Sequence, residues 1–232
     1  MTMKFYDLSG SNGRRFSPFG WRVRMALAHK GLEQNAEVEL VRFSEKEKLK
    51  FSGQSLVPVI VDGTTVVSDS WAIARYLEKT YPDTPSLFGS PVGEAAARFV
   101  STWVDSQIHP LVARCVVADI LKVIDAEDRA YFRRSREERF GMTLEDIVTN
   151  RDETKKQIKM TLYPVRKTVE ERPFLGGETA CFSDYAVFGA FMWAKVVSPF
   201  KIIHSDDPVY AWRERMLNLY SGMPREEAGF AV

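Results

Sequence analysis

Residues 55–81 read SLVPVIVDGTTVVSDSWAIARYLEKTY, and this stretch predicts a strand, a tight turn, a returning strand and a helix. Residues 57–61 are a short β-branched run, an Asp-Gly pair gives a strong hairpin turn signal, and residues 65–67 fit the second strand. Apolar residues then recur at helical spacing as far as Pro82, which stops the helix. The pattern therefore predicts a β-hairpin followed directly by a helix.

Two features of the same stretch are chemical. Pro58 lies where a strand begins and cannot donate to a sheet ladder, so we expect the backbone of Val57 to face something other than a neighbouring strand. Ser70 begins a helix, whose free N–H groups and dipole favour a carboxylate, and Asp69 beside it suits an ammonium group. Together they describe a receptor for a small peptide. An ordinary strand-turn-helix fragment with a serine N-cap is the plainer alternative.

This arrangement resembles the glutathione site of the glutathione S-transferases. The resemblance implies that the Val57-Pro58 bond is cis and that the Val57 backbone pairs with the cysteinyl part of glutathione. It also implies that Asp69 and Ser70 hold the γ-glutamyl end. Gln54, just before the strand, would touch the peptide backbone. Glutathione is thus the expected co-substrate.

The composition fits a globular protein and argues against several function classes. Of the 232 residues, 45% are hydrophobic and 12% aromatic, so two small packed domains are expected rather than disorder. The 32 basic and 31 acidic residues nearly balance, which argues against nucleic acid or an anionic membrane as a partner. The three histidines have no metal-site spacing, so no metal is expected.

The beginning of the chain and its cysteines predict a cytoplasmic protein. The first ten residues, MTMKFYDLSG, lack the long apolar core of a signal peptide. The most apolar window, residues 185–194, is about half the length needed to cross a bilayer. Cys115 and Cys181 are far apart and form no C-x-x-C motif, so we expect buried small hydrophobes rather than nucleophiles.

The amino-terminal part predicts a thioredoxin-like domain. Residues 3–8 and 37–41 fit strands, a helix begins at Ser17, and residues 44–51 fit a short exposed helix or an irregular turn. Joined to the hairpin and helix described first, the order is βαβαββα. An all-helical carboxy-terminal domain is expected to follow.

The expected domain boundaries lie in a proline-rich stretch. We assign residues 1–82 to the thioredoxin-like domain, 83–91 to a linker and 92–232 to the all-α domain.

Three apolar patterns mark the main helices of the second domain. Residues 97–111 predict a long helix bent near Pro110, and residues 158–169 predict another with a kink at Pro164. Residues 183–197 are apolar almost all round and predict the buried central helix.

The start of this central helix carries a second resemblance to the transferases. Their pattern is PFLGG followed by a helix with an early aspartate and a Ser or Thr three residues before it, which caps the helix. Asp184 fits, but Cys181 stands where the Ser or Thr is expected. Either Ser183 or Asp184 caps instead, or the cap is weaker.

Ser17 is the predicted catalytic residue. It begins a helix after the loop that follows the first strand, where the resembled family places its thiol-activating residue. A thiol ionises more readily when its thiolate accepts a hydrogen bond and faces a helix N-terminus. A plain N-cap serine is the alternative. Tyr6, another hydroxyl, is expected to pack within its strand.

The segment FSPFGWR, from Phe16 to Arg22, narrows the resemblance. It is similar to the serine-type branch of bacterial β-aryl-etherase-like transferases and their fungal relatives. That branch implies glutathione-dependent opening of ether bonds in aryl compounds, or binding of such aromatics, and the family implies a homodimer. No cysteine lies near position 17, which argues against a mixed disulfide with glutathione.

The electrophile's pocket is expected between the first loop and the start of the helical domain. Phe16, Trp21 and Trp103 are its candidate apolar walls, although each also suits the core. Residues 127–139 mix five arginines with four acids and predict a salt-bridged outer helix face, with nucleic-acid binding as the alternative.

The leading hypothesis is a glutathione transferase that acts on an apolar, aromatic electrophile. A protein of the same fold that binds glutathione or apolar ligands without turnover is the main alternative. A regulatory domain that has lost glutathione is a third, and the Asp69-Ser70 pair argues against it.

Overall fold

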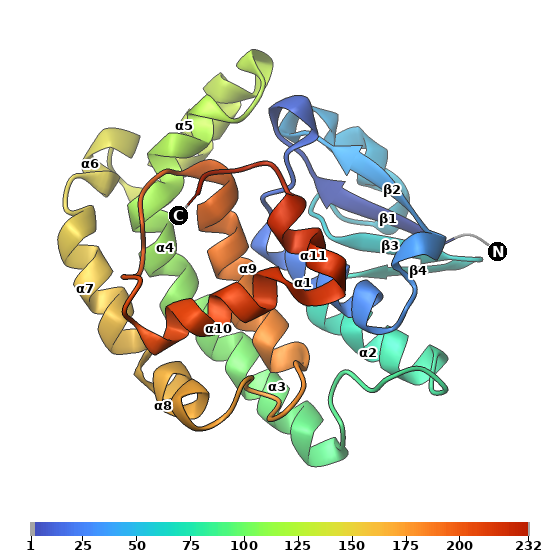
Figure 1. Ribbon diagram of the computed structural model, residues 1–232. Coiled ribbons are helices and arrows are strands. Elements are labelled where there is room, and N and C mark those ends of the chain that lie inside the picture. The colour runs from blue at the N-terminus through green and yellow to red at the C-terminus, as the bar shows by residue number, and fades with distance from the viewer. Residues whose placement is uncertain (1–2, 232) are drawn as a thin grey trace.

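Four strands form one mixed sheet in the computed structural model, which describes residues 3–231 (Figure 1). Their order is β2-β1-β3-β4, in which β1 and β2 are parallel and the other neighbours antiparallel. The strands are β1 (Met3–Leu8), β2 (Ala36–Val41), β3 (Val59–Asp62) and β4 (Thr65–Ser68). Pairing of β3 with β1 starts at Val59, so the strand begins two residues later than predicted and leaves Val57 outside the ladder.

Helices complete this first domain as predicted. After β1 comes α1 (Pro18–His29), after β2 the 3₁₀-helical segment η3 (Phe43–Ser52), and after β4 comes α2 (Ser70–Thr80). The thioredoxin-like order is therefore confirmed.

The rest of the chain is helical, as predicted. The helices are α3 (Pro91–Trp103), the π-helical turn η4 (Val104–Ile108), α4 (His109–Val116), the 3₁₀ turn η5 (Val117–Lys122), α5 (Ala126–Phe140), α6 (Leu144–Val148), α7 (Arg151–Thr161), α8 (Tyr163–Glu171), α9 (Phe182–Val197), α10 (Pro208–Leu217) and α11 (Leu219–Glu226). Within residues 3–231, no helix combines the length and the apolar character needed to span a membrane.

Pro110 and Pro164 have different effects on the helices in which they were predicted. Near Pro110 the chain continues through η4 into α4, so the expected interruption takes the form of a π turn. Near Pro164 the prediction of one kinked helix is wrong: α7 ends at Thr161, and Pro164 lies in the first turn of α8. A proline is favoured there because N–H groups in the first turn have no acceptor within the helix, so the absence of an N–H in proline costs no helical hydrogen bond.

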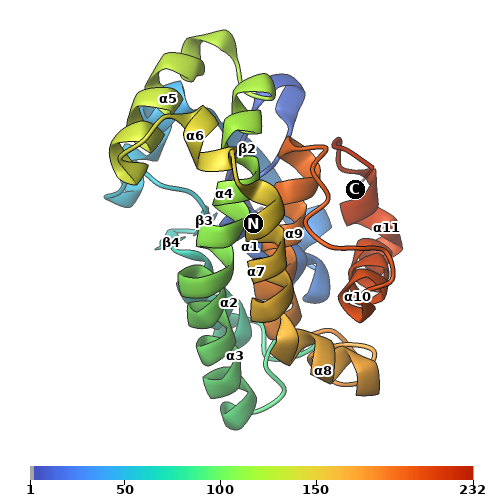
Figure 2. The ribbon, with the colours of Figure 1, turned by 90° about the vertical axis from the view of Figure 1, so that its left-hand side faces the viewer.

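Helix α9 is the buried centre of the second domain, and it also positions the first turn of α1. It packs on α1, α3 and α4, and α10 and α11 lie on its other side (Figure 2). Gly189 allows the close approach, because a Cβ there would lie 2.3 Å from the carbonyl oxygen of Pro18. The apolar core therefore runs through both domains and fixes the residues next to Ser17.

Candidate functional site

Ser17 caps α1 and keeps a donor free. Its Oγ accepts a hydrogen bond from the Gly20 N–H at 3.0 Å, and its side chain is nearly buried, with 5% of the residue exposed. A hydroxyl oxygen that accepts such a bond still has its own hydrogen to donate. The cap geometry therefore fixes the Ser17 oxygen without consuming the O–H that a thiolate needs.

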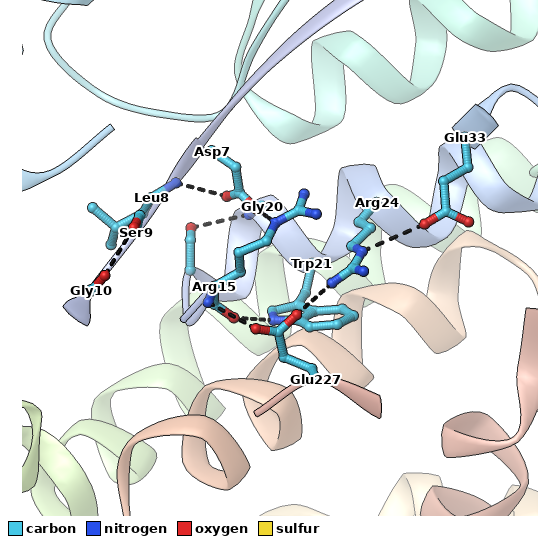
Figure 3. Close-up of polar contacts among 11 residues, drawn as sticks. Asp7, Leu8, Ser9, Gly10, Arg15, Gly20, Trp21, Arg24, Glu33 and Glu227 are labelled. Atoms are coloured by element: carbon cyan, nitrogen blue, oxygen red, sulfur yellow. Dashed lines mark hydrogen bonds and ion pairs between the residues drawn. The ribbon is translucent and has the colours of Figure 1, made fainter. Parts of the chain in front are cut away.

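Contacts of Arg15 hold the loop before Ser17 in place (Figure 3). The Arg15 Nε donates to Asp7 of β1 at 2.8 Å, and the Trp21 indole N–H donates to the Arg15 carbonyl at 2.6 Å. Glu227, from the end of the chain, accepts from the Arg15 backbone N–H at 3.0 Å and from Arg24 at 2.7 Å. Strand, helix and carboxy-terminal tail together hold this loop in place.

Gly20 is required by the close approach of β1. A Cβ at this position would lie 1.8 Å from the Asp7 Oδ1, and Asp7 cannot easily move because it is buried against Arg15. Burial raises the pKa of Asp7, and the Arg15 guanidinium opposes that rise. The Gly20–Asp7 contact thus fixes the first turn of α1 against the sheet.

The second part of the site is the chain around Pro58. The Val57-Pro58 bond is cis, as the resemblance implied. The Asp69 N–H donates to the Pro58 carbonyl at 3.3 Å, which joins this bend to the start of α2. Among residues 3–231, the backbone groups of Val57 have no hydrogen-bond partner. They are therefore available to a ligand, although the chain at Val57 is a bend and the strand begins at Val59.

Asp69, and not Ser70, is the N-cap of α2. One carboxylate oxygen accepts from the N–H groups of Trp71 and Ala72, both at 3.0 Å. Its φ of 77° is unusual for a residue with a side chain and costs about 1–3 kcal/mol. Ser70 is buried in the first helical position, and Gln54 is half-buried ahead of the bend.

A cavity of about 540 Å³ lies between the two domains, where the electrophile's pocket was expected. The first domain contributes Ser17, Val57 and Phe16, and the second domain contributes side chains of α4, α5 and α9. The predicted catalytic hydroxyl and the predicted peptide edge therefore open into the same space. Gln54, Asp69 and Ser70 lie outside its lining.

Two predicted wall residues are in other places. Trp21 is 1% exposed and packs under the Arg24 guanidinium, 4.7 Å from its ring centre, away from the cavity. Trp103 is half-buried against the core at the end of α3 and is also absent from the cavity lining. The prediction fails for Trp21 because Phe19, two residues earlier in the same turn, faces the cavity instead.

Several cavity residues were not predicted. Phe43, Tyr131, Phe140 and Trp193 are aromatic walls, and His109 lies against Phe19 with ring centres 5.1 Å apart. They come from helices far apart in the sequence, so no local motif brings them together.

His109 is a neutral polar group in the cavity wall. Burial, followed by the nearby Arg22 guanidinium, lowers the pKa of His109 to about 3. Its Nε2 is buried without a hydrogen-bond partner among the described residues. The ring is therefore uncharged at neutral pH.

The arginine-rich segment is only partly an outer face. Arg133 pairs with Glu137 and Glu145, both at 2.8 Å, as predicted. Arg136 and Arg139, by contrast, line the cavity. The predicted salt-bridged outer face is therefore present at Arg133, and the prediction is wrong for the face of α5 that carries Arg136 and Arg139.

The cap of α9 is made by Asp184. Its carboxylate accepts from Cys181 N–H at 3.0 Å and from the N–H groups of Leu175, Gly176 and the Trp212 indole. Burial raises the pKa of the Cys181 thiol to about 11. Within residues 3–231, no group of His, Cys, Asp and Glu side chains is placed to hold a metal ion. This cap supports the fold rather than the chemistry.

Sequence comparison relates both halves of the chain to one family. The family model for the glutathione S-transferase N-terminal domain matches residues 16–80, and the model for the C-terminal domain matches residues 95–209. A probable maleylacetoacetate isomerase of Caenorhabditis elegans is 41% identical over 97 residues, covering 41% of this chain and 45% of that protein. A zeta-class glutathione S-transferase of Euphorbia esula is 34% identical over 116 residues, or 49% of this chain and 52% of its own. The chain thus spans about half the length of these curated relatives.

Solved structures match over nearly the whole chain. A glutathione transferase of Phanerochaete chrysosporium is 27% identical with a TM-score of 0.77, covering 96% of this chain and 92% of its own. A glutathione S-transferase of Ceriporiopsis subvermispora in complex with glutathione is 25% identical with a TM-score of 0.80, covering 95% and 97%. The two domains and the site between them lead to one conclusion: the chain belongs to the glutathione S-transferase superfamily.

Proposed function

We propose that the protein is a glutathione transferase in which the Ser17 hydroxyl stabilises the thiolate of glutathione for attack on an apolar, aromatic electrophile. One observation carries the proposal: Ser17 and Val57 line the same cavity, whose walls include seven Phe, Tyr and Trp side chains. A peptide held along Val57 therefore has its sulfur near the hydroxyl and near the space for an electrophile.

The peptide is held by groups whose hydrogen-bonding capacity or charge is not fully used within the protein. The N–H and C=O of Val57 pair with the cysteinyl backbone, next to Pro58, and Gln54 contacts the peptide from the preceding turn. Asp69 uses one carboxylate oxygen in its cap, so its charge remains available to the ammonium group of the γ-glutamyl end. Ser70, at the start of α2, receives the γ-glutamyl carboxylate beside the positive end of the helix dipole.

The chemical contribution of Ser17 is a lower thiol pKa. A free thiol titrates near 8.5, and a depression of about one to two units makes much of it reactive at neutral pH. The thiol loses its proton to solvent, the sulfur forms a bond to the electrophilic carbon, and the leaving group departs with the electron pair. Phe16 and Phe19 lie close to Ser17 in the chain and give this space apolar walls.

Aryl ether cleavage is the finer form of the proposal. It is supported by the FSPFGWR segment and by the similarity to fungal transferases along nearly the whole chain. In this reaction the leaving group is a phenolate, which an aromatic cavity accommodates.

The test is turnover of chlorodinitrobenzene, a peroxide and a β-aryl ether by the wild type and Ser17→Ala. We expect glutathione-dependent turnover by the wild type and a loss of about 10- to 100-fold in Ser17→Ala, equivalent to one to two pKa units. Full activity of Ser17→Ala would remove Ser17 from the mechanism. Binding of glutathione with no turnover of any compound would favour the non-catalytic alternative.

We also propose a homodimer in the cytoplasm, with domains at 1–82 and 92–232 joined by 83–91. Large apolar side chains are exposed in both domains, including Phe51, Leu56 and Phe99, which suits burial against a second copy. The two cysteines are unpaired, which suits a reducing compartment. Sedimentation at twice the chain mass would support the dimer, and sedimentation as a monomer at micromolar concentration would contradict it.

A further inference from the structure

The cavity has an unequal set of charges. Its lining contains four cationic side chains, Arg42, Lys46, Arg136 and Arg139, and a single carboxylate, Asp105. That carboxylate is already paired with Arg22 at 2.7 Å. The whole chain, by contrast, has 32 basic and 31 acidic residues, so the excess is local to the cavity.

Two of these cations have partners inside the protein. Arg42 is paired with Glu127 at 2.5 Å and with Glu45 at 3.4 Å. Lys46 donates to the phenol oxygen of Tyr131, and this bond lowers the pKa of Tyr131. These contacts join the start of η3 to α5, and they neutralise the charge of Arg42 and engage the ammonium group of Lys46 in a hydrogen bond.

Arg42 is the cavity cation with carboxylate partners among the described residues, and Arg136 and Arg139 are the cavity arginines without one; Arg136 is half-buried, whereas Arg139 is exposed. The Arg136 guanidinium lies over the ring of Phe132, 4.8 Å from the ring centre, and 5.8 Å from the centre of Phe43. One nitrogen donates to the Ser135 hydroxyl at 2.9 Å, and no carboxylate in the described part of the chain lies within ion-pair distance. Burial, and then the charge of Arg139, lower the pKa of Arg136.

Helical periodicity explains why Arg136 is in the cavity. Phe132, Arg136 and Arg139 follow one another at four- and three-residue spacing, so they share one face of α5. Arg133 lies on another face, where hydrogen bonds to Glu145 and Glu137 raise its pKa. One helix therefore has a neutralised arginine, Arg133, outside and two arginines without a carboxylate partner in the cavity lining, of which Arg136 is the less exposed.

A half-buried guanidinium with no counter-charge is unfavourable until an anion approaches it. The planar guanidinium binds a carboxylate through parallel hydrogen bonds, and the aromatic rings around it suit an aryl group. We propose that the electrophile accepted by this cavity is an aromatic compound with a carboxylate, and that Arg136 binds the carboxylate. The inference rests on the proposed function, because it names the substrate class of the same site.

A matched pair of ligands tests this directly. A chloronitrobenzoate and the corresponding chloronitrobenzamide have the same ring, leaving group and near-equal size, and differ in charge. Their Kd values are measured by quenching of tryptophan fluorescence, since Trp193 lines the cavity, with and without glutathione. Neither measurement requires turnover.

We expect the wild type to bind the benzoate about tenfold more tightly than the benzamide, since a charge-assisted hydrogen bond contributes about this much. Arg136→Gln should abolish the preference without changing the Kd of the benzamide. Arg136→Lys, which keeps the charge but loses the paired geometry, should retain part of the preference. Arg134→Gln is the matched control, because Arg134 is exposed on the same helix and outside the cavity lining.

Equal affinities in the wild type, an unchanged preference in Arg136→Gln, or no binding of either ligand would overturn the inference. Turnover of the benzoate with glutathione distinguishes recognition of the carboxylate from catalysis. If the preference depends on Arg136 but no compound is turned over, the proposed catalysis fails while the recognition of a carboxylate stands.

Discussion

Two places in the molecule have the same local sequence, Ser-Pro-x-Gly, at residues 17–20 and 90–93. In both, the serine is an N-cap, the proline is the first helical residue, and the serine oxygen accepts from the glycine N–H. The distances are 3.0 Å for Ser17 and 3.1 Å for Ser90. A close approach requires the glycine in both places. A Cβ would lie 1.8 Å from Asp7 Oδ1 at Gly20 and 1.9 Å from the Phe88 carbonyl oxygen at Gly93.

The two caps differ most clearly in their surroundings. Ser17 is buried at the cavity wall and Phe19 packs on His109, whereas Ser90 is exposed and Val92 is 79% exposed to solvent. The cap alone therefore accounts for the start of a helix and for nothing more. What makes Ser17 a candidate for chemistry is the packing of a second domain around it.

The largest expected effect comes from adding a methyl group at the two glycines. Gly20→Ala and Gly93→Ala should each lower the free energy of unfolding by about 2–3 kcal/mol, because both force a buried or backbone oxygen to move. Only Gly20→Ala should also reduce activity per folded molecule, since it displaces Asp7 and the loop before Ser17. Urea denaturation and turnover measure both. Full activity in Gly20→Ala would show that this loop does not position Ser17.

The second expected effect separates the cap from the chemistry. Ser17→Ala and Ser90→Ala should each cost about 1 kcal/mol of stability, the usual effect of losing a serine N-cap. Activity should fall about 10- to 100-fold in Ser17→Ala and stay within about twofold in Ser90→Ala. The measurement is kcat/KM for glutathione beside thermal unfolding. Equal activity of the two variants would mean that Ser17 is a plain cap.

A third cap extends the comparison to the other end of the peptide. Asp69→Asn keeps a side chain that caps a helix and tolerates a positive φ, but it removes the negative charge. We expect unchanged thermal stability and a Kd for glutathione about fivefold weaker, the effect of losing one exposed charge interaction. Calorimetric titration measures it. An unchanged Kd would show that Asp69 supports the helix only.

The smallest expected effect concerns the carboxy-terminal tail. Glu227→Gln weakens the bonds to Arg24 and to the Arg15 backbone, so the loop before Ser17 should exchange its amide hydrogens faster. We expect a loss of about 0.5–1 kcal/mol in stability and about a twofold loss of activity. The control is Glu226→Gln, whose side chain is exposed. Identical exchange in the two variants would refute the role of the tail.

Prediction from sequence succeeded where a feature is local. The hairpin, the start of α2 and the Ser17 cap each depend on residues within a few positions of one another, so turn and capping rules find them. Ser70 was correctly predicted to begin α2, but Asp69 was not recognised as the N-cap of that helix. An N-cap residue usually has an extended backbone, whereas Asp69 has a positive φ.

Prediction failed where packing between domains decides. Trp21 and Trp103 were expected in the cavity because they are large and apolar, yet neither lines it and both pack against the core. Arg136 was read as part of a charged outer face, because composition does not indicate which turn of α5 faces the first domain. The break between α7 and α8 was missed because the apolar pattern continues across it.

The most direct test is the titration of the thiol of bound glutathione, followed by the ultraviolet absorbance of the thiolate. We predict an apparent pKa about one to two units below the free value of 8.5 in the wild type and in Ser90→Ala. In Ser17→Ala the pKa should return close to the free value while glutathione remains bound. A depressed pKa that persists in Ser17→Ala would contradict the claim that the Ser17 hydroxyl stabilises the thiolate.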